Sequence, residues 1–287
     1  MSPKQKDPSI SKLNDLGYNV IKVPRTDIAP LDLLAHDASS PQLRKIGTIS
    51  TFWKTAAPIP VPGPPSAASS LNNTHSNKLE LGFGLDLLKG ALAVFGASAP
   101  SLDLSHTSAR SLQFNYTGVT TVSIDTGLIG DYLTEGTLNV GNPETKHRFL
   151  DEGSQVYIIT EVIRSTSITV TATDDQGNGV SLSAPEINGI VGGNVSVKPS
   201  SATNSAITFE SATTPPTAAN FGFKAMLLTW QPTPGGALGS GTGTWAFADA
   251  DDITFAAPVL GRSSAAAAES TGPVVFETGP ESCLLDL

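Results

Sequence analysis

Apolar and polar residues alternate most regularly within residues 156–209. The apolar positions of this alternation that we assign to one face are Ile168, Val170, Ala172, Val180 and Leu182. A period of two places successive side chains on opposite faces of a strand. The polar turn at residues 174–179 separates two β-branched runs, so the pattern predicts a hairpin in which residues 167–173 pair with residues 180–184.

The polar face of this predicted hairpin consists almost entirely of serine and threonine. Between Ser165 and Val197 the only charged residues are Asp174, Asp175 and Glu186. Antiparallel sheets in water commonly carry lysine and glutamate on the wet face. An apolar face opposite a small hydroxylated face is typical of a transmembrane β-barrel. A β-domain with a Ser/Thr-rich surface fits the pattern equally well.

Residues 78–99 carry a second alternating stretch. Its apolar positions are Leu79, Leu81, Phe83, Leu85 and Leu87. Beyond Leu88 both faces are apolar and interrupted by glycine, which favours a segment that bends or changes shape. We predict that this stretch is neither a regular helix nor a surface strand, but partly irregular or short-stranded. Residues 111–124 are predicted to be its return strand.

The rest of the chain predicts short elements around a central sheet. Further strands are expected at residues 18–25, 44–53, 221–230 and 244–255, and short helices at 10–16, 127–133 and 142–150. Residues 156–162 and 221–228 are expected to be central strands. The predicted fold class is α+β, with a twisted antiparallel central sheet and peripheral short helices.

A proline-rich stretch at residues 56–77 interrupts this pattern. It opens A-A-P-I-P-V-P-G-P-P, which favours an extended or disordered loop, and a linker more than a ligand of an SH3-type domain. We expect residues 1–256 to form one domain and residues 257–287 to form a connector and a tail.

Composition and charge narrow the classes of partner. The chain has 287 residues, of which 15% are charged, and a net charge of −9, which argues against nucleic acid. The first 60 residues are nevertheless basic, with eight Lys or Arg against five Asp. These cations suit an anionic lipid surface or an ordinary solvated surface. They are Lys4, Lys6, Lys12, Lys22, Arg25, Arg44, Lys45 and Lys54.

No catalytic or metal-binding pattern is present in the sequence. The four histidines lack the spacing of a metal site, and the single cysteine, Cys283, cannot complete one or form an intrachain disulfide. Nucleophile elbows and phosphate-binding loops are absent, and adjacent acids such as Asp174 and Asp175 suit a solvated turn. We therefore expect neither an enzyme nor a cofactor.

The sequence also lacks a signal peptide and a membrane-spanning helix. The first twelve residues have no apolar core. The most apolar run, residues 87–99, is interrupted by Lys89 and is shorter than the about 20 residues that a spanning helix needs. Entry into a membrane would therefore require strands.

Several blocks together resemble the bacterial and fungal gasdermins. They are L-N-D-L-G-Y-N-V-I-K-V-P-R-T-D-I-A-P-L-D-L-L (13–34), the proline-rich break, S-N-K-L-E-L-G-F-G-L-D-L-L-K-G (76–90), V-Y-I-I-T-E-V-I-R-S (156–165) and F-G-F-K-A (221–225). The resemblance covers residues 13–230. It implies a pore-forming cell-death effector with a gasdermin N-terminal-domain fold, inhibited by a short C-terminal tail. A protease partner removes the tail, and the body oligomerises as a large β-barrel built from two hairpins per subunit.

One feature of some bacterial gasdermins is missing here. Those members resemble one another in a lipidated N-terminal cysteine, and residues 1–12 contain no cysteine. We therefore do not expect palmitoylation.

The C-terminal tail is unusually apolar for a chain end, which is normally polar. Its apolar residues are Val274, Val275, Phe276, Leu284, Leu285 and Leu287. The preceding low-complexity connector, 257–272, is the expected cleavage region. We expect the cut after Arg262 or Leu260 ahead of one after the acidic residues of 249–252, by a caspase-like, trypsin-like or subtilisin-like protease.

Two hypotheses of different classes remain at this point. The first is an autoinhibited pore-former that is monomeric in the cytoplasm, and that becomes a homo-oligomer in the cell membrane, on anionic lipid, once activated. The second is a β-rich binding or structural module without pore activity.

Overall fold

The computed structural model describes residues 17–37, 43–68, 74–75, 79–97, 108–150, 154–182, 194–201, 205–232 and 243–249. These residues fall into two compact units. The first comprises the described residues within 1–28, 65–122 and 162–223, and the second those within 29–64, 123–161 and 224–287. Strands β11 (Ser154–Ser165) and β15 (Ala219–Pro232) contribute residues to both.

The first unit is mainly β-structure with one long helix. Its elements are β1 (Asn19–Arg25), β5 (Ser66–Ala67), β6 (Thr74–His75), β7 (Leu79–Glu80), α3 (Leu81–Phe95), β8 (Ser111–Thr117), most of β9 (Thr120–Ser123), β12 (Ser167–Thr173), β13 (Val195–Pro199) and β14 (Ala206–Ser211). The second unit carries the short helices. Its elements are β2 (Asp32–Asp37), β3 (Leu43–Thr48), α2 (Ile49–Phe52), β4 (Trp53–Thr55), α4 (Thr126–Thr134), β10 (Gly136–Leu138), α5 (Pro143–Phe149) and β16 (Gly243–Asp249).

The fold class is α+β, as the sequence predicts, and each strand pairing with a determined register is antiparallel. The strand order of the larger sheet is β1–β15–β11–β2–β3. Strands β11 and β15 therefore lie inside the sheet, which confirms the two predicted central strands. Residues 156–160 of β11 are all buried, so this part of the strand is covered on both faces.

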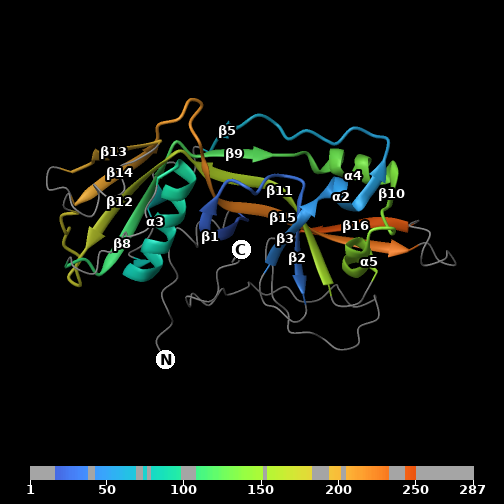
Figure 1. The fold of residues 1–287 in the computed structure, drawn as a ribbon, viewed down its shortest axis with the longest axis horizontal. Helices are drawn as coiled ribbons and strands as arrows, with labels where there is room; N and C mark the ends of the chain where they lie inside the picture. The colour runs from blue at the N-terminus through green and yellow to red at the C-terminus, as the bar shows by residue number, and fades with distance from the viewer. Residues whose placement is uncertain are drawn as a thin grey trace. The chain divides into compact units, whose positions relative to one another are not determined.

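A second sheet belongs wholly to the first unit. Its order is β13–β14–β12–β8–β6, with Val170 of β12 opposite Phe114 of β8 and Ile207 of β14. Helix α3 packs against this sheet (Figure 1), and its Leu88, Leu92 and Phe95 share one buried cluster with those strands.

Helix α3 corrects the prediction for residues 78–99. Its leucines at 81, 85, 88 and 92 and Phe95 recur at helical spacing, and this stripe is buried on the sheet. The apolar residues of 79–87 also fit the period of two of a strand, so the local sequence does not distinguish a helix from a strand. Burial of the helical stripe against the sheet favours the helix. Gly96, with a φ of 91°, ends the helix in a Schellman motif: Gly96 N–H donates to Ala93 O and Ala97 N–H to Leu92 O.

Three further predictions about strands need correction: those for residues 44–53, for residues 111–124, and for the hairpin that begins at residue 167. Residues 44–53 form β3, α2 and β4 instead of one strand, because Ile49 and Phe52 turn into the core of the second unit. Residues 111–124 split into β8 and β9 at Gly118, whose φ is 61°, and β8 meets the 78–99 stretch only through the two-residue strand β7.

The predicted pairing of residues 167–173 with 180–184 is limited to a bridge between Thr173 and Gly179 in the described part of the chain. Strands β8 and β14 occupy both edges of β12 as far as Thr171, so the hairpin pairing is confined to the end of β12, where Val180 N–H donates to Ala172 O at 2.9 Å.

Helices α4 and α5 lie where the sequence predicts them. The Asp125 carboxylate caps α4 by accepting from Gly127 N–H at 2.8 Å, and the Asn142 side chain caps α5 by accepting from Glu144 N–H at 3.0 Å. Strand β16 confirms residues 243–249 of the predicted last strand. The predicted helix at 10–16 and the tail at 257–287 lie outside the described residues.

Candidate functional site

The candidate functional site is the second sheet of the first unit, together with helix α3. Most of the residues that the sequence assigns to one face of two inserting stretches meet there in a single cluster. Ile168, Val170 and Ala172 are 2%, 0% and 0% exposed. Leu182 is buried in the same cluster, and Leu81, Leu85 and Val180 pack against it. Phe83 lies in α3, but its side chain is outside what the structure describes.

The register of β8, β12 and β14 makes the apolar face continuous across three strands. Ile168 lies opposite Tyr116 and Phe209, and Ala172 lies opposite Leu112. Helix α3 contributes to the same cluster, so these side chains are shielded from water by a helix instead of by lipid. From the sequence, β8 was predicted only as a return strand. Its residues S-L-Q-F-N-Y-T nevertheless alternate between polar and apolar as those of β12 do, which could have assigned it to the same apolar face.

Helix α3 approaches this sheet most closely at Gly84. A Cβ atom at Gly84 would lie 2.9 Å from Leu112 Cβ, whereas a Cβ at Gly82 would meet nothing within 4 Å. Real Cβ atoms essentially never show a 2.9 Å contact. The glycine at position 84 therefore allows the helix to seat on β8.

The opposite face of the sheet is polar and nearly free of charge. Thr169 Oγ1 lies 2.7 Å from Thr208 Oγ1, and Ser111 Oγ lies 2.6 Å from Thr173 Oγ1. The charged side chains of Lys198 and Glu210 pair with each other at 2.6 Å. This face is therefore a network of hydroxyl groups that satisfy one another without carrying net charge.

Two polar atoms on this sheet lack a hydrogen-bond partner. They are Asn115 Oδ1 and Ser167 Oγ, both buried. A buried acceptor without a partner costs about 1–3 kcal/mol. The packing of this sheet in the described structure therefore includes an unfavourable contribution from the strands that form the hydroxyl face.

The turn after β12 is fixed by its own acid. The Asp174 carboxylate accepts from the backbone N–H groups of Gln176 and Asn178 at 2.9 and 2.8 Å, and from Asn178 Nδ2 at 3.1 Å. The Asn178 side chain, and then its backbone N–H, lower the pKa of Asp174. This acid therefore serves the turn, and it does not form a carboxylate pair with the exposed Asp175.

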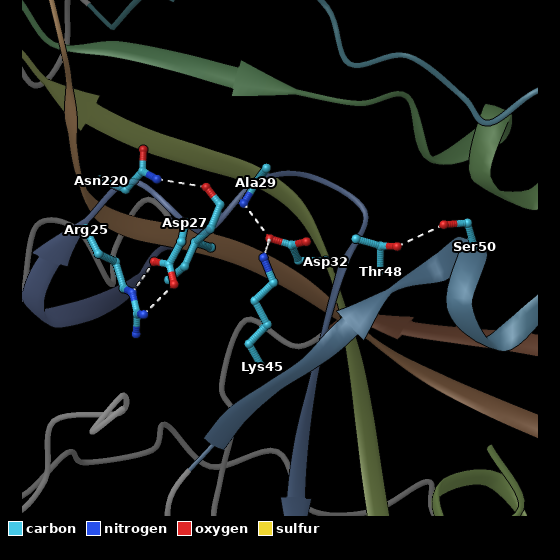
Figure 2. Close-up of polar contacts among 9 residues, drawn as sticks. Arg25, Asp27, Ala29, Asp32, Lys45, Thr48, Ser50 and Asn220 are labelled. Carbon is cyan, nitrogen blue, oxygen red and sulfur yellow. Dashed lines mark hydrogen bonds and ion pairs between the residues drawn. The ribbon is translucent and has the colours of Figure 1, made fainter. Parts of the chain in front are cut away.

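Three of the basic residues assigned to lipid contact have acidic neighbours, and Figure 2 shows two of these pairs. Arg25 forms a two-pronged ion pair with Asp27, and Lys45 Nζ lies 2.8 Å from Asp32 Oδ2. Arg44 lies 3.8 Å from Glu144. Lys54 is exposed. The side chain of Lys22, and Lys4, Lys6 and Lys12 altogether, lie outside the described residues.

The described residues hold no group of three His, Cys, Asp or Glu side chains that could bind a metal ion. Burial raises the pKa of Tyr157 to about 12, and its hydroxyl donates to Gln155 Oε1, so this tyrosine is a structural donor. Within the same part of the chain, no helix combines the length and apolar character needed to cross a membrane.

The structure does not describe the residues that the sequence assigns to cleavage and to the inhibitory tail. The cleavage candidates Leu260 and Arg262 and the apolar tail residues from Val274 to Leu287 lie outside the described residues.

Comparison with known proteins identifies related chains. Residues 21–242 match the model of the Bacterial Gasdermin Family. A gasdermin of Vitiosangium sp. (strain GDMCC 1.1324) is 32% identical over 209 residues, which are 71% of this chain and 76% of that protein. A gasdermin of Lysobacter enzymogenes is 30% identical over 233 residues, which are 80% of this chain and 83% of that protein.

The fold is also that of a solved structure. A bacterial gasdermin from Bradyrhizobium tropiciagri matches with a TM-score of 0.59 at 17% identity, over 85% of this chain and 93% of that chain.

Proposed function

Because the chain belongs to the bacterial gasdermin family, whose members are pore-forming effectors of cell death and not enzymes, we propose how this pore-former is restrained and released. Residues 257–287 hold the body inactive and monomeric in the cytoplasm. A protease of the caspase, trypsin or subtilisin type cuts the connector, after Arg262 or Leu260. The body then oligomerises in the cell membrane as a large β-barrel.

The observation that carries this proposal is the two-faced sheet under α3. Its apolar face is continuous across β8, β12 and β14, and its opposite face is hydroxylated and nearly uncharged. A barrel strand needs lipid on one face and a wet lumen on the other. In the pore, lipid takes the place that α3 occupies in the described structure.

The strands must lengthen for this exchange. A transmembrane strand needs about 9–11 residues, whereas β8 and β12 have 7 each. The extra residues come from the turn at 174–179 and from α3, whose first turns keep a period-two alternation beneath their helical packing. The four glycines at 82, 84, 90 and 96 allow that change of conformation.

The tail supplies the restraint. Full burial of a Val, Leu or Phe side chain contributes about 1.5–3 kcal/mol, so several tail residues docked together hold well while the connector keeps their effective concentration high. Cleavage makes the contact bimolecular, and the tail leaves. The basic N-terminal residues then favour anionic lipid by about 1 kcal/mol each near the surface.

A liposome experiment tests this proposal. The intact chain, the chain truncated after Arg262, and the intact Phe276→Asp/Leu284→Asp variant are compared for dye release from anionic vesicles. We expect the intact chain to be inert and both altered forms to leak. If all three remain inert, the tail is not an inhibitor.

A further inference from the structure

Residues 57–64, which we call the proline strap, have their conformation fixed by covalent structure. In the sequence A-P-I-P-V-P-G-P every residue is a proline or directly precedes one. Proline fixes its own φ near −65°, and the residue before a proline is confined to extended conformations. The strap is therefore extended before any packing is considered, which explains why it carries no helix or strand.

The strap runs alongside helix α4, and two hydrogen bonds, one from Thr55 at the end of β4 and one from Gly63 within the strap, reach the residues that flank that helix. At one end, Thr55 Oγ1 donates to Glu135 O at 3.1 Å, just after α4 ends. At the other, Gly63 N–H donates to Ser123 O at 2.8 Å, just before α4 begins. Figure 1 shows this trace between β4 and β5, along α4. The strap is therefore held in one position beside α4, and we call the strap and this helix together the ridge.

The exposed large apolar side chains of the described residues lie on the strap and on the helix beside it. Ile59 and Val61 of the strap are 51% and 79% exposed, and Leu128, in the first turn of α4, is 48% exposed. Exposed apolar side chains that gather in one place mark an interaction site more often than isolated ones do. Ile59 and Val61 alternate with half-buried Pro60 and Pro62, so the apolar side chains between the prolines point outward.

Charge and hydrogen bonding identify the kind of partner. Prolines at every second position remove the N–H groups that strand addition needs, so a β-strand partner does not fit. Asp125, Asp131 and Glu135 of the adjoining helix are exposed and have no ion pair in the described part of the chain. Their charge opposes an anionic membrane surface and complements a basic one.

We propose that the proline strap docks a partner protein that reads extended proline-rich chain in an aromatic-lined groove with a basic rim. Such grooves bind preformed extended proline segments, because little conformational entropy is lost on binding. The two tethers to the ends of α4 lower that cost further. This docking site belongs to the second unit, whereas the sheet on which the pore proposal rests belongs to the first, and the docking proposal does not depend on the pore proposal.

Photocrosslinking tests this inference. The full-length chain, with Val61 replaced by p-benzoylphenylalanine, is irradiated in cells of its native host. The captured protein is then purified, and its affinity for the unmodified full-length chain is measured. The synthetic octapeptide A-P-I-P-V-P-G-P serves as competitor.

The proposal requires three results together. The captured protein binds the full-length chain, the octapeptide displaces it, and Ile59→Ser/Val61→Ser weakens binding about tenfold or more. Lys89→Ser, at an exposed position of α3, is the control and leaves the affinity unchanged. Unaltered thermal unfolding of the double variant shows that its fold is kept.

Several results would overturn the proposal. They are an adduct with lipid, an adduct with a second copy of the chain, no adduct, or a captured protein that the octapeptide and the double variant do not affect. An adduct with lipid or with a second copy would assign the ridge to the membrane or to subunit contact instead.

Discussion

At the scale of single residues, the turn before β2 contains a residue, Leu31, whose strained backbone conformation is maintained by the burial of its side chain. Asp32 N–H donates to Ala29 O at 3.1 Å, Pro30 follows Ala29, and Leu31 has a φ of 74°, which is a type II turn with leucine where glycine is usual. Leu31 is buried in the core of the second unit. The side chain of Asp32 completes the turn, because its carboxylate accepts from Ala29 N–H at 2.7 Å and pairs with Lys45.

We therefore expect Asp32→Ala to be strongly destabilising. The Asp32 side chain is 4% exposed, so its loss removes the acceptor of the Ala29 N–H and the charge opposite Lys45 Nζ, at a cost of about 2–4 kcal/mol. Asp27→Ala is the matched control, since the Asp27 side chain is 52% exposed and such surface pairs contribute about 0–1 kcal/mol. Urea unfolding measures both, and equal losses would contradict this assignment.

The Asp174 turn predicts a dependence on pH. The pKa of Asp174 is lowered by the Asn178 side chain first and its backbone N–H second. A carboxyl group with a lowered folded pKa adds stability above its unfolded value, about 3.9, and loses it as the pH falls through the folded value. We expect Asp174→Asn to reduce the urea midpoint at pH 7 and the difference from wild type to shrink below that lowered pKa. A difference that is constant with pH would contradict the role of the charge.

At the scale of elements, the sequence predicts most of what local pattern and chain termination control. The strands that become β1, β11, β12 and β15, and the capped helices α4 and α5, follow from alternation and from Asp125 and Asn142 at the N-caps. The shared buried face of Ile168, Val170 and Ala172 on β12 follows from the same alternation.

Two features could not be predicted because they depend on packing between distant segments. Helix α3 and a strand satisfy the residue pattern of 79–87 equally, and only the apolar face of β8, β12 and β14 selects the helix. Likewise, the pairing of β14 with residues 167–171 of β12 confines the predicted hairpin to the end of that strand, and no local signal reports this. Gly96 is the sequence signal that could have located the end of α3.

The contact of α3 with β8 at Gly84 can be tested by a matched pair of substitutions, one at Gly84 and one at Gly82. Gly82→Ala enters open space and should stabilise the protein by about 0.5–1 kcal/mol, since glycine weakens a helix interior. Gly84→Ala meets Leu112 and should destabilise by about 1–3 kcal/mol through overpacking. Thermal unfolding measures both.

The same two substitutions also test whether α3 must leave the sheet for the pore to form. In the chain truncated after Arg262, Gly84→Ala should leak dye faster than Gly82→Ala, because α3 leaves the sheet more readily. A shift of the same sign in stability for both variants would show that α3 does not seat at position 84.

At the scale of the whole molecule, our proposal requires the described fold and the inserted state to use the same side chains. Val170 is fully buried between Phe114 and Ile207, so Val170→Arg unfolds the soluble protein as well as blocking insertion. A test of the two faces needs a small, neutral substitution that both states accept.

Cysteine labelling in the assembled pore provides that test, and it examines the central claim most directly. Truncation after Arg262 removes Cys283, the single cysteine, so Val170→Cys and Thr169→Cys each introduce a unique thiol that a core tolerates. Pores are formed in liposomes and treated with a water-soluble maleimide. If the buried face turns to lipid and the hydroxyl face to the lumen, Thr169→Cys reacts about tenfold faster or more than Val170→Cys. Equal rates, or faster reaction at position 170, would contradict the account.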